Sequence, residues 1–261
     1  MNIFKQFYKS IYSPKDIALF RFQGIGKTIL YIFLLTLISI LPSVYFLSSA
    51  INSGIDSART VLKDQLPDFT IQNGQLAAET NVPITVNQDH FTIILDPTGV
   101  ITSNKLSDTD HSFALLKNEF VLVAGGQTET YAYSMVQGMK LTKQDLQNFL
   151  DTLNGMKLVI TPLVSLFIYF FSAASNFIEI SILALFGLAL KNLAGRRLNY
   201  RQLWRMAAYS ETLPTLFFTI MGALKTAVPS SFLINWFVAI IVLFLAIKET
   251  PKPKNAEEAR M

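Results

Sequence analysis

Glu179 is the one charged residue in a long apolar stretch, residues 158–190. An ionised carboxylate inside a bilayer costs several kcal/mol unless it is paired, protonated or hydrated. Polar residues precede it at alternating spacings of four and three, which places all five on one helix face: Ser165, Tyr169, Ser172, Asn176 and Glu179. We expect this polar seam to face other helices, with Asn176 donating a hydrogen bond to Glu179.

The polar seam has two interpretations. A carboxylate at this depth can relay a proton or a cation. Polar seams more commonly hold membrane helices together by hydrogen bonds, so the packing interpretation is favoured. A second carboxylate, Glu211, stands near the start of another apolar segment, where Arg205 or a lipid headgroup would neutralise it. For Glu211 we therefore predict an interfacial ion pair.

The sequence has no recognisable catalytic motif. It lacks cysteine, which excludes disulfides, thiolate catalysis and Cys-ligated metal sites. The patterns G-x-S-x-G, S-x-x-K and H-E-x-x-H are all missing. His90 and His111 each follow an aspartate, but they lack the i, i+4 spacing of a zinc hydrolase, and we expect solvent-exposed loop residues. We predict no catalytic residues, no metal, no cofactor and no enzymatic activity.

The elements that position the seam must be membrane spans, because the chain is 51% hydrophobic and only 15% charged. Its charge is unevenly distributed. Residues 52–157 hold 7 basic and 12 acidic residues, whereas segments 1–28, 191–212 and 248–261 together hold 14 basic and 5 acidic ones. Basic flanks stay in the cytoplasm, so 52–157 should lie outside. The net charge of +4 then reflects contact with anionic lipid rather than nucleic acid.

These patterns predict an α-helical integral membrane protein with four transmembrane helices, both termini in the cytoplasm and a small β-rich (α+β) extracytoplasmic domain. The predicted segments are an amphipathic cytoplasmic segment at 1–28, spans at 29–50, 158–190, 207–228 and 232–247, the extracytoplasmic domain at 51–157, a basic cytoplasmic loop at 191–206 and a cytoplasmic tail at 248–261. In the first segment, residues 3–12 should form a helix that lies on the membrane surface.

The extracytoplasmic domain carries a hairpin signal at Asn73-Gly74. A two-residue loop there pairs Ile71 with Leu76 and Phe69 with Ala78, which puts four apolar side chains on one face. Further strand-like runs lie at 84–86, 91–95, 113–116, 120–124 and 128–133, with a turn at 96–99. About 100 residues suffice for a domain with its own core.

A family resemblance rests on five short segments of the sequence: residues 7–14, 20–28, 66–69, 73–76 and 94–99. They resemble a family of bacterial membrane proteins of unknown function, whose members are often labelled maltodextrin-utilisation proteins. Residues 200–203 and 207–214 resemble the segment that enters a span in Yip1-like membrane proteins. The first resemblance implies a multi-pass protein of the Gram-positive plasma membrane, connected by label with maltodextrin use, and it supplies no catalytic residues.

Two functions fit this architecture. The first is an accessory or regulatory membrane protein whose outer domain senses or docks something at the cell surface, in the context of carbohydrate uptake. Its expected partners are membrane lipids and a membrane protein, such as a sugar permease or a sensor kinase, and no nucleic acid. The alternative is a transporter or channel component, assembled as a homo-oligomer, that uses the polar seam of the second span.

Overall fold

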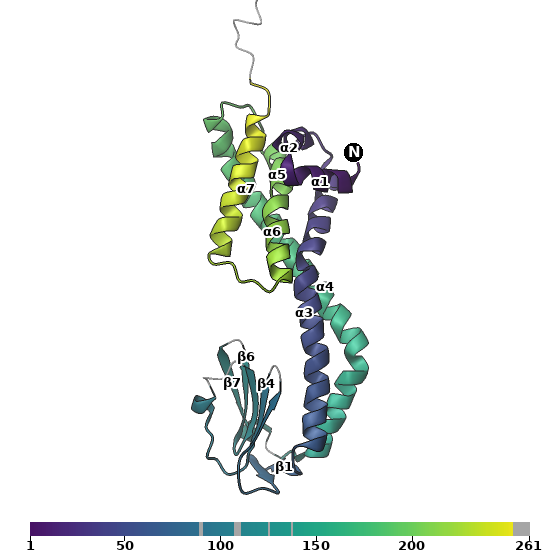
Figure 1. The fold of residues 1–261 in the computed structure, drawn as a ribbon, viewed down its shortest axis with the longest axis vertical. Coiled ribbons are helices and arrows are strands. Elements are labelled where there is room, and N and C mark those ends of the chain that lie inside the picture. The colour runs from purple at the N-terminus through teal and green to yellow at the C-terminus, as the bar shows by residue number, and fades with distance from the viewer. Residues whose placement is uncertain (89–90, 107–110, 125, 137, 253–261) are drawn as a thin grey trace, which may run out of the picture. The chain divides into compact units, whose positions relative to one another are not determined.

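The computed structural model describes residues 1–88, 91–106, 111–124, 126–136 and 138–252, which form two compact units (Figure 1). The first unit comprises Met1–Leu47 and Pro162–Met261, and the second comprises Ser48–Thr161. Two long helices, α3 (Ile25–Asp64) and α4 (Lys143–Leu193), each contribute residues to both units. His90 lies outside the described residues, so the expectation for it stays a prediction.

Within the described residues, three helices are long and apolar enough to cross a membrane: α3, α4 and α7 (Ser231–Lys248). They contain 40, 51 and 18 residues. In the most apolar stretch of α4, only 6% of the residues are buried within the protein. Water would disfavour so large a continuous apolar surface, whereas lipid chains would cover it at no cost.

The third predicted span, 207–228, is two helices instead of one. They are α5 (Tyr200–Ser210) and α6 (Thr212–Ala223), and Glu211 lies between them. Pro214 has no amide hydrogen to donate to the carbonyl of Ser210, which weakens the helix at this point. The helix also ends earlier than predicted, because Lys225 adopts a left-handed conformation with φ 53°. Alone, the 12 residues of α6 extend about 18 Å, less than the ~30 Å of a hydrocarbon core.

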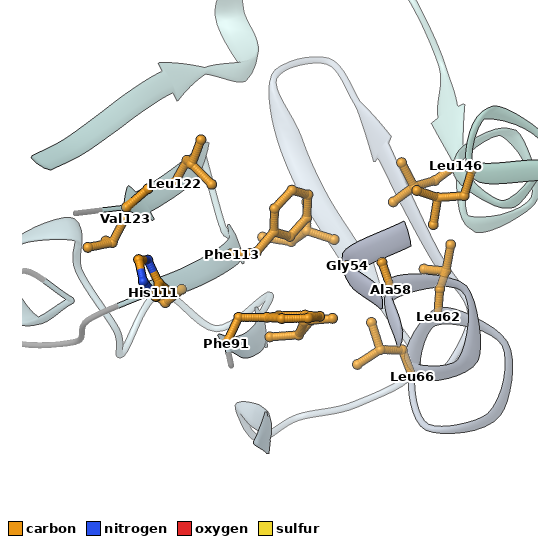
Figure 2. A pocket seen from close by; sticks show the side chains of 15 residues that line it. Gly54, Ala58, Leu62, Leu66, Phe91, His111, Phe113, Leu122, Val123 and Leu146 are labelled. Atoms are coloured by element: carbon orange, nitrogen blue, oxygen red, sulfur yellow. The ribbon is translucent and has the colours of Figure 1, made fainter. Parts of the chain in front are cut away.

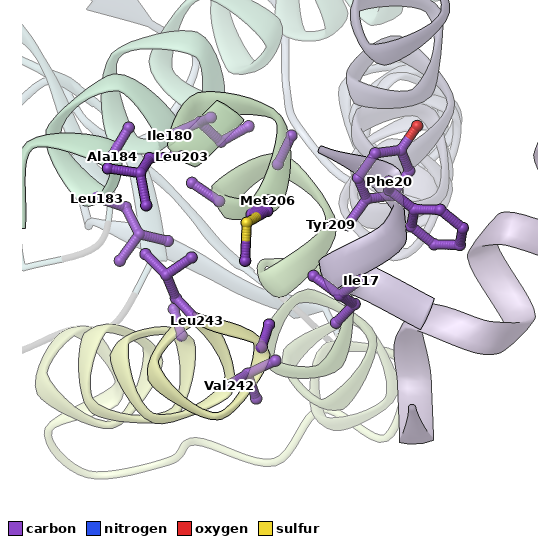
Figure 3. Packing of buried hydrophobic residues seen from close by; sticks show 14 of the residues in the cluster. Ile17, Phe20, Ile180, Leu183, Ala184, Leu203, Met206, Tyr209, Val242 and Leu243 are labelled. Atoms are coloured by element: carbon purple, nitrogen blue, oxygen red, sulfur yellow. The ribbon is translucent and has the colours of Figure 1, made fainter. Parts of the chain in front are cut away.

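The core of the first unit joins α4, α5 and α7 to the short helix α2 (Pro14–Phe20) (Figure 3). A Cβ on Gly187 would lie only 3.2 Å from a methyl of Leu203, so glycine permits α4 and α5 to approach closely. Tyr209 of α5 is fully buried and packs on Phe20 and Tyr31, with ring centroids 4.6 and 4.3 Å apart. Offset aromatic contacts of this kind add to the free energy of burial.

The first helix, α1 (Ile3–Tyr12), packs against the protein through the polar Gln6 and Ser10 as well as the apolar Ile3 and Phe7. Gln6 and Ser10 are buried, and Gln6 Oε1 accepts a hydrogen bond from the Tyr209 hydroxyl at 3.3 Å. Three aromatic residues one turn apart are exposed instead: Phe4, Tyr8 and Tyr12. An exposed aromatic stripe suits the membrane interface, where amphipathic rings accumulate.

The second unit contains two sheets. The smaller has the strand order β2–β1–β8, from β1 (Phe69–Gln72), β2 (Gln75–Ala78) and β8 (Leu141–Thr142). The larger has the order β3–β4–β5–β6–β7, from β3 (Ile84–Gln88), β4 (Phe91–Asp96), β5 (His111–Leu116), β6 (Glu119–Ala124) and β7 (Gln127–Ala132). Short 3₁₀ helices lie at Ser103–Lys105 and Tyr133–Val136.

The hairpin register is the predicted one, with Ile71 opposite Leu76 and Phe69 opposite Ala78. By contrast, the sequence patterns did not predict that β4 and β5 pair in parallel. Each face of the larger sheet has its own core, since alternate residues of a strand point to opposite faces. Ile93 and Leu95 pack with residues of α3, and Ile94 packs on the other side with Leu106 and Val121.

Asp96 anchors the turn after β4. It is fully buried, and its carboxylate accepts hydrogen bonds from the amides of Thr98 (2.8 Å), Gly99 (3.1 Å) and Ile101 (2.6 Å) and from the Thr98 hydroxyl (2.5 Å). Burial alone would raise the pKa of Asp96, but these hydrogen bonds outweigh it and hold the pKa below its ordinary value. The stabilisation is therefore present above about pH 4 and lost as the pH falls through the lower folded-state value.

We expect Asp96→Asn to destabilise the second unit by about 1–3 kcal/mol at neutral pH, because an amide cannot accept all four hydrogen bonds. Hydrogen exchange of β4 and β5 in the full-length protein should accelerate accordingly. The matched control is Asp64→Asn, since Asp64 is exposed. Equal exchange in the Asp96 variant and the wild type would show that the turn does not depend on this carboxylate.

Candidate functional site

Two carboxylates, Glu179 and Glu211, line one small cavity of about 10 Å³ in the first unit. Room for a single water molecule needs a cavity of about this size. Ile32, Leu35, Asn176, Ile180 and Thr215 complete the lining, so α3, α4 and α6 all contribute. We refer to Thr36, Asn176, Glu179, Glu211 and Asn235 together as the carboxylate cluster.

Glu179 receives its hydrogen bond from α7, where the Asn235 side-chain amide donates to Oε1 at 2.6 Å. The donor expected from the sequence, Asn176, instead donates to the Thr36 hydroxyl of α3 at 2.8 Å. That expectation was wrong because a residue one turn away on the same helix competes with partners on neighbouring helices. The two amides therefore connect α4 to α3 and to α7.

The other seam residues lie on the same face of α4. The Tyr169 hydroxyl donates to the backbone carbonyl of Phe33 at 3.2 Å, which adds a second link to α3. Ser165 and Ser172 are half-buried on this face. Hydrogen bonds from three of the five seam residues thus reach other helices, as a packing seam requires, and the seam ends at the cavity that holds the two carboxylates.

Glu211 occupies a different environment from the interfacial one predicted for it. Its side chain is only 4% exposed, and its Oε1 has no hydrogen-bond partner among the described residues. Arg205, the expected ion-pair partner, instead donates to the backbone carbonyl of Arg21 at 2.9 Å. The helix is interrupted at Glu211, between α5 and α6, and this interruption places the Glu211 side chain in the cavity.

The second unit contains a groove of about 290 Å³, larger than the carboxylate cavity and different in chemistry. Its lining is aliphatic and aromatic except for His111 and Ser112. We call it the apolar groove. Its fifteen lining residues are Gly54, Ala58, Leu62, Leu66, Phe91, Ile93, His111, Ser112, Phe113, Leu115, Leu122, Val123, Ala124, Leu146 and Leu150.

The apolar groove lies between one face of the larger sheet and residues of α3 and α4 (Figure 2). Phe91 and Phe113 form the middle of the sheet side, with Leu62 and Leu146 on the helices. His111 lies toward one end and is exposed, as predicted, but it begins strand β5 and does not lie in the predicted loop. Sequence patterns could not find the groove, because its residues are distributed over five elements and look like ordinary core positions.

Among the described residues, no group of three or more histidine, aspartate and glutamate side chains lies close enough to hold a metal ion. A family model described as "protein of unknown function (DUF1189)" matches residues 4–247. The chain belongs to the DUF1189 family. The match to DUF1189 covers nearly the whole chain, including every residue of the carboxylate cluster and of the apolar groove.

Membership of the DUF1189 family carries no activity with it. No curated protein and no solved structure matches this chain. The comparisons therefore support an uncharacterised family, and they add neither the maltodextrin label nor the likeness to Yip1-like proteins. The two sites of this DUF1189 chain are therefore the features from which its function can be inferred.

Proposed function

We propose that this protein is an accessory or regulatory protein of the bacterial plasma membrane, whose extracytoplasmic domain binds an acyl chain in the apolar groove. The apolar lining of that groove is the observation that carries the proposal. In this arrangement four spans hold the second unit outside the cytoplasm, and both termini lie inside. The α5 and α6 helices act together as the third span, because end to end they extend about 36 Å.

The chemistry of the apolar groove favours an acyl chain over a sugar or an extended peptide. Each hydroxyl of a maltodextrin, and each backbone amide of a peptide, would lose its hydrogen bonds to water on entering a site that cannot replace them. An acyl chain has no such groups, and its burial contributes about 25 cal/mol for each Å² removed from water. A link with carbohydrate uptake would then act through a partner and not through sugar bound in this groove.

The size of the apolar groove sets a further limit. At about 290 Å³ it lies at the lower end of the range for ligand pockets. One acyl chain therefore fits better than the two of a phospholipid. His111 stands at one end of the groove, where the polar end of a single-chain amphiphile would reach water.

Binding in the groove can affect both long helices, because α3 and α4 each contribute residues to its lining. Ala58 and Leu62 belong to α3, and Leu146 and Leu150 belong to α4. A bound chain would add contacts to both helices within the second unit. A ligand shifts a conformational equilibrium only by its difference in affinity for the two states, and contacts to two separate helices provide such a difference.

A photoreactive fatty acid tests this proposal in native membranes. We expect a diazirine-bearing fatty acid to label peptides that line the groove, and excess maltodextrin to leave the labelling unchanged. Gly54→Leu should reduce this labelling several-fold, because nothing lies within 4 Å of a Cβ at Gly54 and the new side chain would fill the groove. Labelling of lipid-facing peptides in the same protein serves as an internal reference.

The matched control is Gly155→Leu on α4, where a new Cβ also meets nothing within 4 Å but the residue does not line the groove. Both changes replace a helical glycine, so both should favour the helix slightly. Labelling that Gly54→Leu and Gly155→Leu leave equally intact would contradict the proposed site. Labelling that maltodextrin displaces would contradict the proposed ligand class.

A further inference from the structure

The two carboxylates of the carboxylate cluster share one cavity. Among the residues that the structure describes, no lysine or arginine lines it. The described salt bridges of the chain join other residues. Two like charges in one small cavity repel each other and both lose most of their hydration, so the two groups cannot both stay ionised cheaply.

The hydrogen-bond geometry distinguishes the two groups, although the Asn235 side chain faces both carboxylates. Glu179 Oε1 accepts from the Asn235 amide at 2.6 Å, and a donor of this kind stabilises an ionised carboxylate. Glu211 is 4% exposed and lines the same cavity, and its Oε1 has no partner among the described atoms. An orphaned, fully buried carboxylate oxygen is the position that most needs a proton.

Within the described part of the chain, the neighbouring elements place no cation against Glu211 that could neutralise it in place of a proton. On α3, Tyr31 shares a hydrogen bond with the Thr212 hydroxyl, and on α5 Tyr209 bonds to Gln6. Arg205 of α5, the nearest cation in the sequence, bonds to a backbone carbonyl of α2's C-cap. The neighbouring elements α6 and α7 contribute neutral Thr215 and Asn235.

We propose that the carboxylate cluster is a proton-binding site in which Glu211 holds the proton and Glu179 remains ionised. The cavity between them accommodates one water molecule, which can bridge the two carboxyl groups. Loss of the proton would place two negative charges among α4, α7 and the α5–α6 break. Helix packing in this unit is therefore coupled to the occupancy of the site, which also provides what a proton-coupled transport component would need.

Infrared spectroscopy of the full-length protein in lipid nanodiscs tests the site directly, because a protonated carboxylic acid has its own carbonyl stretching band. At neutral pH we expect this band in the wild type, with a shift in D₂O. Glu211→Gln should abolish it, and Glu179→Gln should retain it. Raising the pH to about 10 should remove the band from the wild type as the second carboxyl ionises.

Several results would overturn this assignment. One is a wild-type spectrum without the band at neutral pH. Another is a band that Glu211→Gln leaves intact. A band that sodium or potassium ions remove at constant pH would identify a metal-cation site instead. The matched control is Glu249→Gln, because Glu249 is exposed at the end of α7 and its loss should leave the band unchanged.

The glutamine variants keep the size and the hydrogen-bonding shape of the side chain, and size-exclusion chromatography reports whether they fold. If Glu211→Gln did not fold, Glu211→Asp would replace it, with the band expected to persist at a shifted frequency. A Glu211→Asp spectrum identical to that of the wild type would overturn the assignment. The pH and sodium arms use only the wild-type protein, so they decide the question even without variants.

Discussion

Replacing Asn235 with leucine should lower the unfolding free energy of the full-length protein by about 1–3 kcal/mol, the cost of leaving the half-buried Glu179 carboxylate without its donor. Asn235 supplies the 2.6 Å hydrogen bond to Glu179, and that bond joins α7 to α4. Leucine has a similar size and suits an apolar helix, so the loss would report the missing amide and not a cavity.

The double variant Asn235→Leu with Glu179→Leu should recover most of this loss, because it removes both the carboxylate and its donor. Apolar pairs of similar volume commonly replace buried polar pairs at little cost. The double-mutant cycle should therefore give a coupling of about 1–3 kcal/mol, measured by denaturant titration in detergent micelles. The exposed Asn192→Leu on α4 is the control for the replacement of an asparagine by leucine where no hydrogen bond to a carboxylate is lost. Additive losses from the two single variants would show that the hydrogen bond contributes nothing to packing.

The same cycle separates packing from proton binding. A double variant as stable as the wild type would mean that packing does not need the polar pair, which leaves its proton chemistry as the reason for it. A double variant as unstable as the single variants would give the cluster a structural role. Buried polar groups frequently cost stability where they serve a function, and the two results therefore point in opposite directions.

Local patterns were sufficient to predict the elements whose signals lie within a few residues of one another. The Asn73-Gly74 hairpin has the register that its turn and alternation require. Two of the predicted spans lie within α3 and α4, and the last one nearly coincides with α7. Length and apolarity determine such helices, because every backbone hydrogen bond of a span stays within the segment.

Partners distant in sequence could not be predicted. Asn235 lies 56 residues from Glu179, and Thr36 lies 140 residues from Asn176. The environment of Glu211 depends on the helix break beside it. The mean apolarity of residues 207–228 gives no sign of that break. The apolar groove has the same origin, since its lining comes together only through sheet pairing that includes the parallel β4–β5 contact.

The sequence also did not predict which side of α1 faces the rest of the protein. Apolarity correctly indicated an amphipathic helix, but it did not show that the polar Gln6 and Ser10 would be buried beside Ile3 and Phe7. The aromatic residues Phe4, Tyr8 and Tyr12 are exposed instead. A polar face with internal partners, such as Tyr209 for Gln6, cannot be distinguished by sequence from a solvated one.

The proposed function depends on one central claim, that four spans hold the second unit outside the cytoplasm and leave both termini inside. The chain contains no cysteine, so single cysteines can be introduced and labelled without background. Suitable exposed positions are Gln75 in the second unit, Ser231 at the start of α7, Asn192 at the end of α4 and Pro251 after α7. Gly195 is less suitable, because its φ of 61° strains any residue with a side chain.

The decisive measurement is the reaction of these single cysteines with a membrane-impermeant maleimide on intact cells, followed by the same reaction after permeabilisation. We expect Gln75→Cys and Ser231→Cys to react on intact cells, and Asn192→Cys and Pro251→Cys to react only after permeabilisation. The expected difference is all or none. Protection of Gln75→Cys on intact cells would place the apolar groove in the cytoplasm, and reaction of Asn192→Cys there would contradict the four-span arrangement.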